Sequence, residues 1–454
     1  MTDFEPLYTA DEMRAAEAKY PGYPGTVGEL MERAGGLVAE VALSLHADAQ
    51  RWTVVCGGGS NGGDGRIAAR ELERAGKDVR IVDAKAGETE LGEPEVIVDA
   101  LFGTGFSGAP RPDAAALIER MNASGARVLA VDLPSGVDAS TGEVAGAAVH
   151  ADATVTFHGR KLGLAVAPGR FHAGEVHVVD IGLEPVDTEA RLVLPGLLDS
   201  VPRRGERDNK YTAGHVLVVG GSPGLTGAPS LTAMAALRAD AGYVTLAAPA
   251  ATLPVLEQRL LEVVKRPLPD DLTELAAKAS SLAIGPGLGR GEDAHRLVRR
   301  SLAELALPAV VDADALFGLE PGDWPAPRVL TPHEGELGRL LGRDSKEVAA
   351  HRLASVREAS ERFGCVVLLK GPDTLVAAPG RGLLVSSLGL PSLATAGTGD
   401  VLTGIVGAFL AKGLDAQLAA AAAAAAQQLA SVAAEQRAGL VAGDLIEALP
   451  RVLA

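Results

Sequence analysis

The amino-acid sequence predicts an α/β protein of two domains, each a parallel sheet between two layers of helices. The chain has 454 residues, which at roughly 100–200 residues per domain is enough for about two to four domains. Short β-branched runs alternate with helical stretches along the whole chain, and this alternation is typical of βα units around a parallel sheet. Hydrophobic residues make up 47% of the chain and charged residues 22%, which excludes disordered and fibrous proteins.

The first domain is predicted over residues 1–190. Apolar residues recur on one helical face over 27–45, which predicts a helix ahead of the sheet. The β-branched runs that follow predict strands at 52–56, 79–83, 96–100, 127–132, 153–157 and 175–181. Prolines and mixed charges without periodicity then predict a linker at 191–200.

The second domain is predicted over residues 201–454. Its predicted strands are 215–221, 243–249, 280–287, 308–314, 328–332, 365–371 and 374–380. A helix from about Asp400 and an alanine-rich helix over 418–430 close the chain. The two series of strands share no obvious repeat, so the sequence indicates a fusion of two α/β domains and not a duplication.

The net charge indicates which binding partners to exclude, and the cysteines indicate the cellular compartment. The net charge of −16 argues against nucleic acid and anionic membrane surfaces as partners, although a helix N-terminus can still bind a small anion. The first residues lack a targeting pattern, and the alanine-rich segment suits a buried helix better than a membrane span. Cys56 and Cys365 lie in apolar runs, which predicts buried thiols in a reducing compartment. We therefore expect a cytoplasmic protein.

The first glycine-rich loop allows two interpretations. Residues 57–62 spell G-x-G-x-x-G between a strand and a helix, and Asp83 ends the next strand, as in a dinucleotide-binding Rossmann unit. However, Asn61 and Asp64 place an amide and a carboxylate in the turn where a pyrophosphate would sit. A carboxylate there repels phosphate but suits a hydroxyl, a ribose or a cation.

Two further strands of the first domain end in acids. Asp99 and Asp132 lie at strand ends, each followed by a turn that contains glycine, and Ser135 follows Asp132. The carboxyl ends of parallel strands share one edge of the sheet, so Asn61, Asp99 and Ser135 offer hard oxygens to one crevice, as a cation requires. The alternative is that each aspartate caps a helix, but several polar residues and two glycine-rich turns at one edge favour a site.

These motifs resemble the NAD(P)H-hydrate epimerase domain, a Rossmann-like three-layer αβα fold, over about residues 8–184. The resemblance is carried, in order, by GGGSNGGDGRIAAR, DALFGTGFSG, VDLPSGVDASTG and ADATVTFHGRKLGL. It implies potassium at Asn61, Asp99 and Ser135, and we expect Asp132 to transfer protons. Ser60 stands where the family has asparagine, and Arg160 precedes Lys161 where the family has proline. The implied substrate contacts are Ser60, Asn61, Gly62, Gly63, Asp64, Gly103, Thr104, Gly105, Phe106, Ser107, Gly108, Ala109 and Asp132.

A second site is predicted where Gly397-Thr398-Gly399-Asp400 opens a helix. The backbone amides and the helix dipole there can stabilise a phosphoryl group in transit, and Asp400 can accept a hydroxyl proton as general base. The alternative of an ordinary helix cap is weak beside the other elements. Lys370 and Thr374 flank a turn that could clasp nucleotide phosphate, whereas no P-loop motif occurs. Further glycine or polar residues at strand ends are Gly285, Gly287, Gly289, Asp312, Asp314, His333 and Glu336.

These elements resemble the ribokinase-like superfamily and, within it, the ADP-dependent NAD(P)H-hydrate dehydratase, over roughly residues 200–450. The resemblance implies a ribokinase-like αβα domain and magnesium organised by Glu336 through water. Asp240 stands where the family has a small residue. The implied contacts with the hydrated nicotinamide nucleotide are Ala228, Gly287, His333 and Asp400; those with ADP are Lys370, Gly371, Pro372, Asp373, Thr374 and Gly399.

Together the resemblances imply repair of hydrated NADH and NADPH, whose nicotinamide ring carries a hydroxyl at C6 in two epimers. The first domain would interconvert the R and S hydrates, and the second would dehydrate the S hydrate with ADP, releasing AMP and phosphate. Both families self-associate, so we expect a homo-oligomer. One alternative is a ribokinase-like small-molecule kinase with an accessory N-terminal domain, which the ratio of ADP to AMP would distinguish. The other is a non-enzymatic nucleotide sensor or scaffold with a decayed first site, which Asn61, Asp64, Asp99 and Asp132 oppose.

Overall fold

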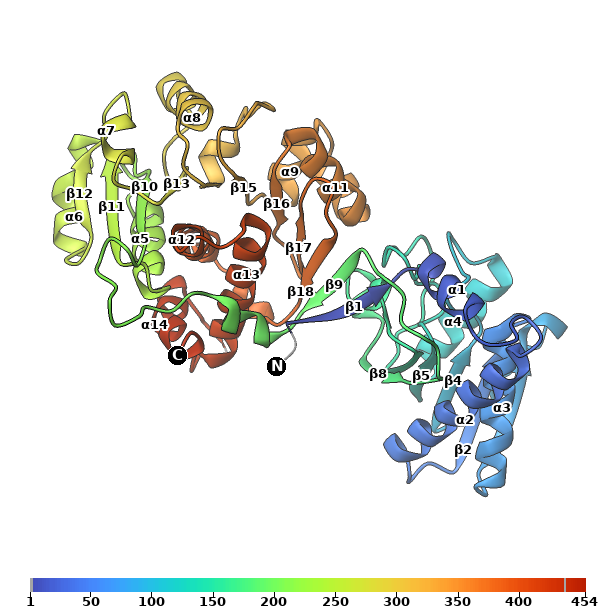
Figure 1. Cartoon of the computed structure of the whole chain (residues 1–454). Coiled ribbons are helices and arrows are strands. Elements are labelled where there is room, and N and C mark those ends of the chain that lie inside the picture. The colour runs from blue at the N-terminus through green and yellow to red at the C-terminus, as the bar shows by residue number, and fades with distance from the viewer. Residues whose placement is uncertain (1–2, 437) are drawn as a thin grey trace. The chain divides into compact units, whose positions relative to one another are not determined.

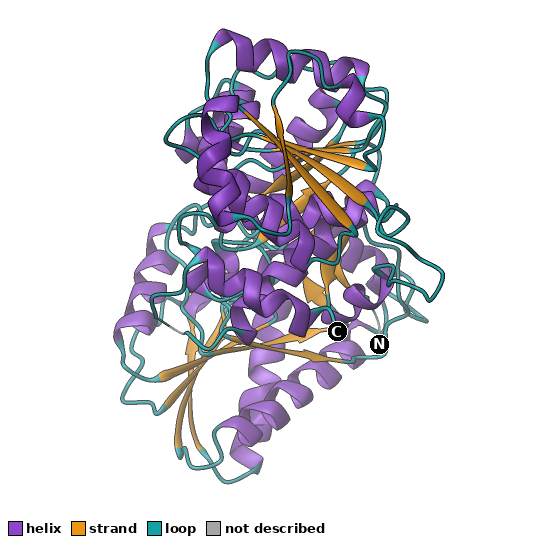
Figure 2. Ribbon diagram, turned by 90° about the vertical axis from the view of Figure 1, so that its left-hand side faces the viewer, coloured by secondary structure: helices purple, strands orange, loops and turns teal. Residues whose placement is uncertain are grey.

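The computed structural model describes residues 3–436 and 438–454 and divides the chain into two compact units. The N-terminal unit is Pro6–Ala190, and the C-terminal unit combines the residues up to Glu5 with Arg191–Ala454. Each unit contains one sheet with helices on both faces (Figures 1 and 2). The predicted α/β class with two αβα domains is therefore confirmed, but the sheet of the C-terminal unit is mixed and not wholly parallel as expected.

The sheet of the N-terminal unit has six parallel strands in the order β3-β2-β4-β5-β6-β8. The strands are β2 (Arg51–Cys56), β3 (Asp78–Asp83), β4 (Val96–Ala100), β5 (Arg127–Val131), β6 (Ala153–Phe157) and β8 (Glu175–Val179). The helices are α1 (Ala10–Ala18), α2 (Val27–Leu45), α3 (Ser60–Arg74) and α4 (Pro112–Ala123). The strand order reverses at β2, and open α/β sheets bind ligands at the carboxyl ends of the strands beside such a reversal.

The core of this unit explains why its strands are continuous apolar runs. One cluster joins the sheet to α2 and α3, through residues such as Val38 and Leu72, and a second cluster joins the opposite face to α4, through Leu117 and Ile118. Strands covered on both faces need apolar residues at successive positions, as in WTVVC of β2.

The sheet of the C-terminal unit runs in the order β12-β11-β10-β13-β14-β15-β16-β17-β18, with β9 and the start of β1 beyond β18. Pairing is parallel from β12 to β16 and antiparallel from β16 through β17 to β18. The strands are β1 (Phe4–Tyr8), β9 (Ala190–Val193), β10 (His215–Val219), β11 (Tyr243–Ala248), β12 (Val264–Pro267), β13 (Ser281–Ile284), β14 (Ala309–Val311), β15 (Arg328–Leu330), β16 (Val366–Leu369), β17 (Thr374–Ala377) and β18 (Leu383–Ser386). Strand β1 ends in the N-terminal unit, where Leu7 and Tyr8 pair with β7 (Arg160–Lys161).

The helices of the C-terminal unit include α12 and α13, which are buried along most of their length. The helices are α5 (Gly227–Arg238), α6 (Leu253–Arg259), α7 (Thr273–Ala276), α8 (Glu292–Glu304), α9 (Glu334–Leu341), α10 (Ser345–Ala350), α11 (Arg352–Phe363), α12 (Thr398–Ala411), α13 (Ala416–Ala433) and α14 (Ala442–Val452). Short 3₁₀ turns in the chain are η1 (Ala84–Ala86), η2 (Leu162–Leu164), η3 (Gly169–Phe171), η4 (Pro195–Ser200), η5 (Ala250–Thr252), η6 (Ala313–Leu316) and η7 (Pro391–Leu393). Alanine lets α13 pack closely inside the core. Within the described residues, none of the helices has the length and hydropathy that a membrane span requires.

Two expectations about short segments can be compared with the structure. Residues 191–200, where we expected a linker, form most of β9 and all of η4, and Val193 and Leu197 are buried in the core. Cys56 and Cys365 are buried free thiols, and burial raises the pKa of Cys56 to about 11 and that of Cys365 to about 12. Both cysteines are therefore unreactive core residues at neutral pH.

Candidate active sites

The first candidate site begins where β2 turns into α3. Asn61 and Asp64 are buried in the first turns of α3, whereas Ser60 is exposed. A Cβ on Gly62 would collide with the carbonyl oxygen of Gly57, so only glycine permits this tight turn. The turn therefore aims an amide and a carboxyl side chain into the unit.

A salt bridge between Arg66 and Asp83 argues against the Rossmann interpretation of this loop. Arg66 Nη2 lies 2.7 Å from Asp83 Oδ2, and Arg66 Nη1 donates to the carbonyl oxygens of Gly57 and Gly62 at 3.2 and 3.1 Å. Asp83 also accepts hydrogen bonds from the backbone of Lys85 and Ala86. The acid at the position of a ribose-binding residue is thus occupied by the protein itself.

Hydrogen bonds between Asp99 and Ser135 join the carboxyl end of β4 to the loop after β5. Ser135 donates from Oγ to Asp99 Oδ1 at 2.7 Å and from its backbone nitrogen to Asp99 Oδ2 at 2.8 Å. Ser135 Oγ in turn accepts from the backbone of Phe102 at 2.8 Å. Asp99 is fully buried, and burial raises its pKa to about 6 despite these hydrogen bonds.

The residues expected to hold potassium meet in this region. A Cβ on Gly103, the neighbour of Phe102, would lie 2.8 Å from Asn61 Oδ1, so Asn61 faces the loop that Ser135 anchors. The amide nitrogen of Asn61 is buried without a hydrogen-bond partner. Among the described residues no cluster of three or more His, Cys, Asp or Glu side chains could hold a metal. A cation here would instead depend on one carboxylate with amide and hydroxyl oxygens, a donor set that fits potassium.

Asp132 follows β5 in a left-handed backbone conformation, with φ of 67°. Its Oδ1 lies 2.6 Å from Lys161 Nζ, and Lys161 is fully buried. Its Oδ2 accepts from the backbone of Thr104 at 2.9 Å and from the Thr104 hydroxyl. Burial raises the pKa of Asp132, but the charge of Lys161 and the hydrogen bonds from Lys161 and Thr104 together outweigh burial, so the pKa is lowered. Asp132 is therefore ionised at neutral pH.

Two other carboxyl groups face this ion pair. The pKa of Asp64 is raised to about 8, mainly by burial and then by the charges of Asp132 and Glu17, although Lys161 lowers it in part. Burial and then Asp132 also raise the pKa of Glu17, which comes from α1. Glu17 lies outside every sequence motif and was not predicted; its one sequence signal is a carboxylate in the helix between β1 and β2.

The remaining predicted contacts of the first site lie on the loop after β4. Phe106 stacks on Phe102, with ring centroids 4.7 Å apart, and Gly105 is exposed. The other exposed residues of this loop are Ser107, Gly108 and Ala109. The structure thus presents this segment on the surface beside Thr104 and Asp132.

The second candidate site is built around the start of α12. Gly397 precedes the helix with φ of 89°, a conformation that glycine adopts freely. Helix α5 packs against this turn, because Thr232 Oγ1 lies 3.0 Å from the carbonyl oxygen of Asp400 and 3.1 Å from that of Ala228. The predicted residues Ala228 and Asp400 are therefore brought together.

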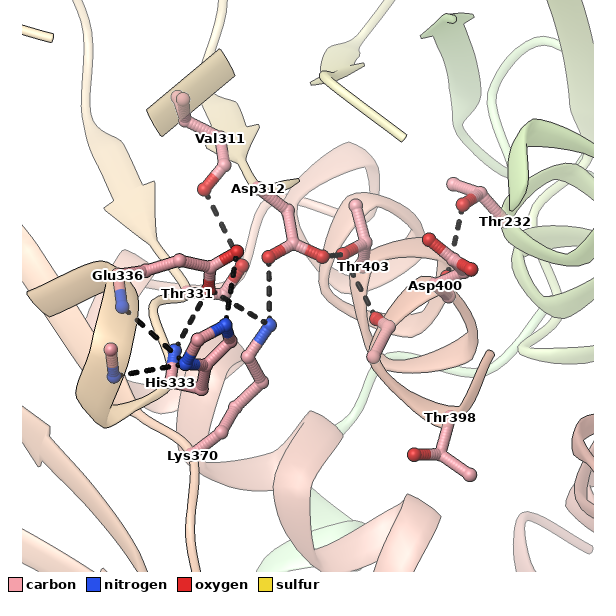
Figure 3. A network of polar contacts seen from close by, with 12 residues as sticks. Thr232, Val311, Asp312, Thr331, His333, Glu336, Lys370, Thr398, Asp400 and Thr403 are labelled. Carbon is pink, nitrogen blue, oxygen red and sulfur yellow. Dashed lines mark hydrogen bonds and ion pairs between the residues drawn. The ribbon is translucent and has the colours of Figure 1, made fainter. Parts of the chain in front are cut away.

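Lys370 points from the end of β16 toward the same place (Figure 3). Its Nζ lies 2.8 Å from Asp312 Oδ1 and 3.9 Å from Glu336 Oε2. A Cβ on Gly399 would lie 3.4 Å from Lys370 Nζ, so the ammonium group is next to the first turn of α12. Burial disfavours the charge on Lys370, but Asp312 and Glu336 outweigh burial and raise its pKa. The site thus contains a permanent cation beside the backbone amides of α12.

The charges of several other acids act on Asp400. The pKa of Asp400 is raised to about 7, mainly by burial and then by repulsion from Asp312, which exceeds the attraction to Lys370. Asp314 and Glu336 add to the repulsion. A carboxyl group whose pKa lies near neutrality is suited to general base catalysis.

His333 has a structural role in addition to its predicted one. Its Nδ1 accepts from the backbone nitrogens of Gly335 and Glu336 at 3.0 and 3.4 Å, and Glu336 Oε2 accepts from the His333 nitrogen at 2.9 Å (Figure 3). This capping box starts α9. The His333 side chain is 56% exposed, so it caps the helix and still faces solvent.

Only part of segment 370–374, which was predicted to bind the nucleotide, is accessible at the surface. Asp373 and Thr374 are buried, and Thr374 Oγ1 accepts from Gln428 Nε2 at 3.3 Å. Gly371 and Pro372 are exposed. The exposed surface of this turn is therefore mainly that of residues 371–372, with Lys370 extending from its base.

Two loops complete the second site. The carbonyl oxygen of Gly287 accepts from the backbone nitrogens of Gly221 and Ser222 at 2.9 and 2.7 Å, which joins the turns after β13 and β10.

Asp240, which departs from the family pattern, accepts from Lys412 Nζ at 2.7 Å and lies 2.8 Å from Arg204 Nε. Its charge is therefore compensated by two cations.

Both units of the chain are similar to known proteins. Residues 216–451 match the family described as NAD(P)H-hydrate dehydratase, and residues 27–91 and 82–163 match the family described as YjeF-related protein N-terminus. The chain is 38% identical to the bifunctional NAD(P)H-hydrate repair enzyme Nnr of Moorella thermoacetica, over 98% of this chain and 96% of that protein. It is 39% identical to the protein of the same name from Pyrobaculum aerophilum, over 98% and 97%. It also resembles the solved structure of the ADP/ATP-dependent NAD(P)H-hydrate dehydratase from Bacillus subtilis, co-crystallised with ATP and Mg²⁺, with a TM-score of 0.51 and 28% identity over 56% of this chain and 94% of that one.

The mixed sheet and the carboxylate at the glycine-rich start of α12 define a ribokinase-like enzyme, joined here to a second α/β domain with its own site. The full-length matches identify the member of this class. The chain belongs to the family of bifunctional NAD(P)H-hydrate repair enzymes.

Proposed function

We propose that the two units of this NAD(P)H-hydrate epimerase and dehydratase act in succession on hydrated NADH and NADPH. The N-terminal unit interconverts the R and S hydrates, and the C-terminal unit dehydrates the S hydrate with ADP as co-substrate. A chiral dehydratase site uses one epimer only, so the epimerase allows the whole pool to be recovered. We further propose that the enzyme is a cytoplasmic homo-oligomer.

Asp400 is the general base of the dehydration. It takes the proton of the C6 hydroxyl, whose oxygen attacks the β-phosphorus of ADP while the bond to AMP breaks. The amides of residues 397–399 and the ammonium group of Lys370 stabilise the charge that develops. The ring nitrogen lone pair then expels phosphate, and loss of a proton from the neighbouring ring carbon restores the dihydronicotinamide.

The observation that carries this assignment is the position of Asp400. It lies at the amide-rich start of α12, and its pKa of about 7 allows it to hold a proton reversibly at neutral pH. Glu336 would hold magnesium through water, together with the diphosphate, and the metal would neutralise phosphate charge. Magnesium commonly binds to one or two protein carboxylates together with substrate phosphates. Glu336, which is buried and lies 3.9 Å from Lys370, would supply one such carboxylate.

In the epimerase unit, Asp132 accepts a proton from the substrate or from water. Its ion pair with Lys161 supports this role, because it keeps the carboxylate ionised in a buried place. Asn61, Asp99 and Ser135 would hold potassium, which would bind nucleotide oxygens. The loop from Gly103 to Ala109 would cover the nucleotide.

Recovery of reduced-nicotinamide absorbance from a mixture of hydrated NADH epimers tests this function. The full-length protein should restore the absorbance completely with ADP and not without it, and should form one AMP for each NADH recovered. A ribokinase-like kinase would accumulate a phosphorylated alcohol without restoring the absorbance. A sensor or scaffold would consume no nucleotide.

A further inference from the structure

Arg352 is a buried cation that lies outside every motif of the sequence. It is the first residue of α11, and only 4% of its surface is exposed. Long charged side chains are seldom buried unless they hold other groups in place. Its contacts therefore indicate which part of the molecule it holds.

The guanidinium group contacts the nucleotide turn directly. Arg352 Nη2 donates to the carbonyl oxygen of Asp373 at 2.7 Å and lies 3.5 Å from the Asp373 carboxylate, which is fully buried. A Cβ on Gly371 would collide with the guanidinium group, so the backbone of the turn lies against its nitrogens. One side chain thus contacts the turn at both residues that flank Pro372.

The same guanidinium group also contacts the segment that carries His333. Arg352 Nη1 forms an ion pair with Glu334, the first residue of α9. The two segments also meet beyond Arg352, because Lys370 donates from its backbone nitrogen to Pro332 at 2.9 Å. Arg352 therefore joins the start of α9 to the turn after Lys370.

Removal of this cation should disturb the turn more than the rest of the unit. A buried carboxylate that loses a charged partner is strongly destabilised, and the least costly response is movement toward water. Asp373 belongs to the short turn between β16 and β17, whose residues 371 and 372 are exposed, whereas the flanking strands are hydrogen-bonded into the sheet. We therefore expect the turn to shift before the strands do. Such a movement displaces the backbone of Gly371 and, through it, Lys370.

We propose that Arg352 is a positioning residue for the nucleotide co-substrate, which holds the turn 371–373 and the start of α9 in the arrangement that binds the phosphates of ADP. This inference rests on the proposed role of residues 370–374 in binding ADP.

Arg328 offers a matched control for burial alone. It is 1% exposed, and it donates to the backbone carbonyl oxygens of Leu302, Leu305 and Leu307. Arg328 is the first residue of β15, whereas the turn to His333 follows the last residue of that strand. The contacts of Arg328 therefore lie at the opposite end of β15 from His333. Loss of Arg328 should therefore reduce stability without a specific effect on ADP.

The experiment compares Arg352→Met, Arg352→Lys and Arg328→Met in the full-length protein. We expect Arg352→Met to raise the KM and the Kd for ADP by about tenfold or more, with a smaller change in kcat and in the KM for the S hydrate. Arg352→Lys should give an intermediate value, because it keeps the charge but not the paired donors. Arg328→Met should lower the thermal unfolding temperature and leave the KM for ADP within twofold of wild type.

A Kd for ADP within twofold of wild type in folded Arg352→Met would overturn the inference, as would an equal effect of Arg328→Met. If Arg352→Met does not fold, Glu334→Gln removes the partly exposed partner instead. It should raise the KM for ADP about threefold, and an unchanged KM would count against the inference. Lys370→Met tests the proposed ADP-binding role of the turn separately from the positioning role of Arg352. If this variant binds ADP as wild type does, the assignment of the turn to ADP is wrong, whatever the result for Arg352.

Discussion

The substitution Asp400→Asn should remove activity and at the same time stabilise the protein. The change keeps the shape of the side chain and removes a carboxylate that faces Asp312, Asp314 and Glu336. In the described part of the chain, no hydrogen-bond donor pairs with the Asp400 carboxyl oxygens, since Thr232 contacts only the backbone. The substitution therefore removes the burial cost of the charge and the repulsion from Asp312, which together outweigh the lost attraction to Lys370.

The magnitude follows from the pKa of Asp400, which rises from 3.8 to about 7 on folding. At about 1.4 kcal/mol per pKa unit, this sets an upper bound of about 4 kcal/mol, which solvent screening reduces to about 1–2 kcal/mol. A raised pKa means that folding favours the protonated acid, so wild type loses stability as pH rises from about 4 to about 7. The variant lacks this loss and should be the more stable protein at pH 8, with the difference fading toward pH 4.

Two assays check this prediction. Urea unfolding at several pH values should show the stability difference above neutrality. Absorbance recovery from S hydrate and ADP should show a loss of about 10²–10⁴ in kcat for the variant, since a general base is removed, while ADP still binds. In wild type the rate should rise with pH up to about 7, as Asp400 ionises. A wild-type rate would refute the base assignment, and equal stability at pH 8 would refute the repulsion among the acids.

Three further predictions concern the N-terminal unit. Asp132→Asn should leave dehydration of the S hydrate intact but stop consumption of the R hydrate beyond its slow spontaneous conversion; complete consumption of both epimers would contradict the role of Asp132. Lys161→Met should destabilise the unit by about 3–5 kcal/mol in urea unfolding, because it leaves the buried Asp132 carboxylate without its cation. Adding Asp132→Asn should recover part of that loss, and a double variant no more stable than Lys161→Met would show that the two charges are not coupled. Replacing potassium with choline in the buffer should slow epimerisation and not dehydration; equal epimerisation rates would argue against a cation held by Asn61, Asp99 and Ser135.

Motifs that are continuous in sequence could be predicted, and contacts between distant segments could not. The turn at Gly57–Gly62 and the start of α12 are visible as glycine patterns, because a Cβ on Gly57 or Gly62 would collide with a backbone oxygen and Gly397 has a positive φ. Glu17 and Arg352 were missed, because each acts through residues from other elements and has no local signature. Strand β18 was also missed, because it is defined by backbone pairing with β17, which leaves no pattern of its own in the sequence.

The sequence by itself determined the order of βα units, the two glycine-rich sites and the family resemblance, because these depend on local sterics and on short patterns. Only the tertiary structure decided the charge states of Asp132 and Asp400, the two aspartates proposed to be catalytic. The pKa of Asp132 is lowered because Lys161 and Thr104 surround it, whereas that of Asp400 rises to about 7 because it is buried near Asp312. The same side chain is thus an ionised group in one unit and a titrating base in the other, since its neighbours come from segments that only folding brings together.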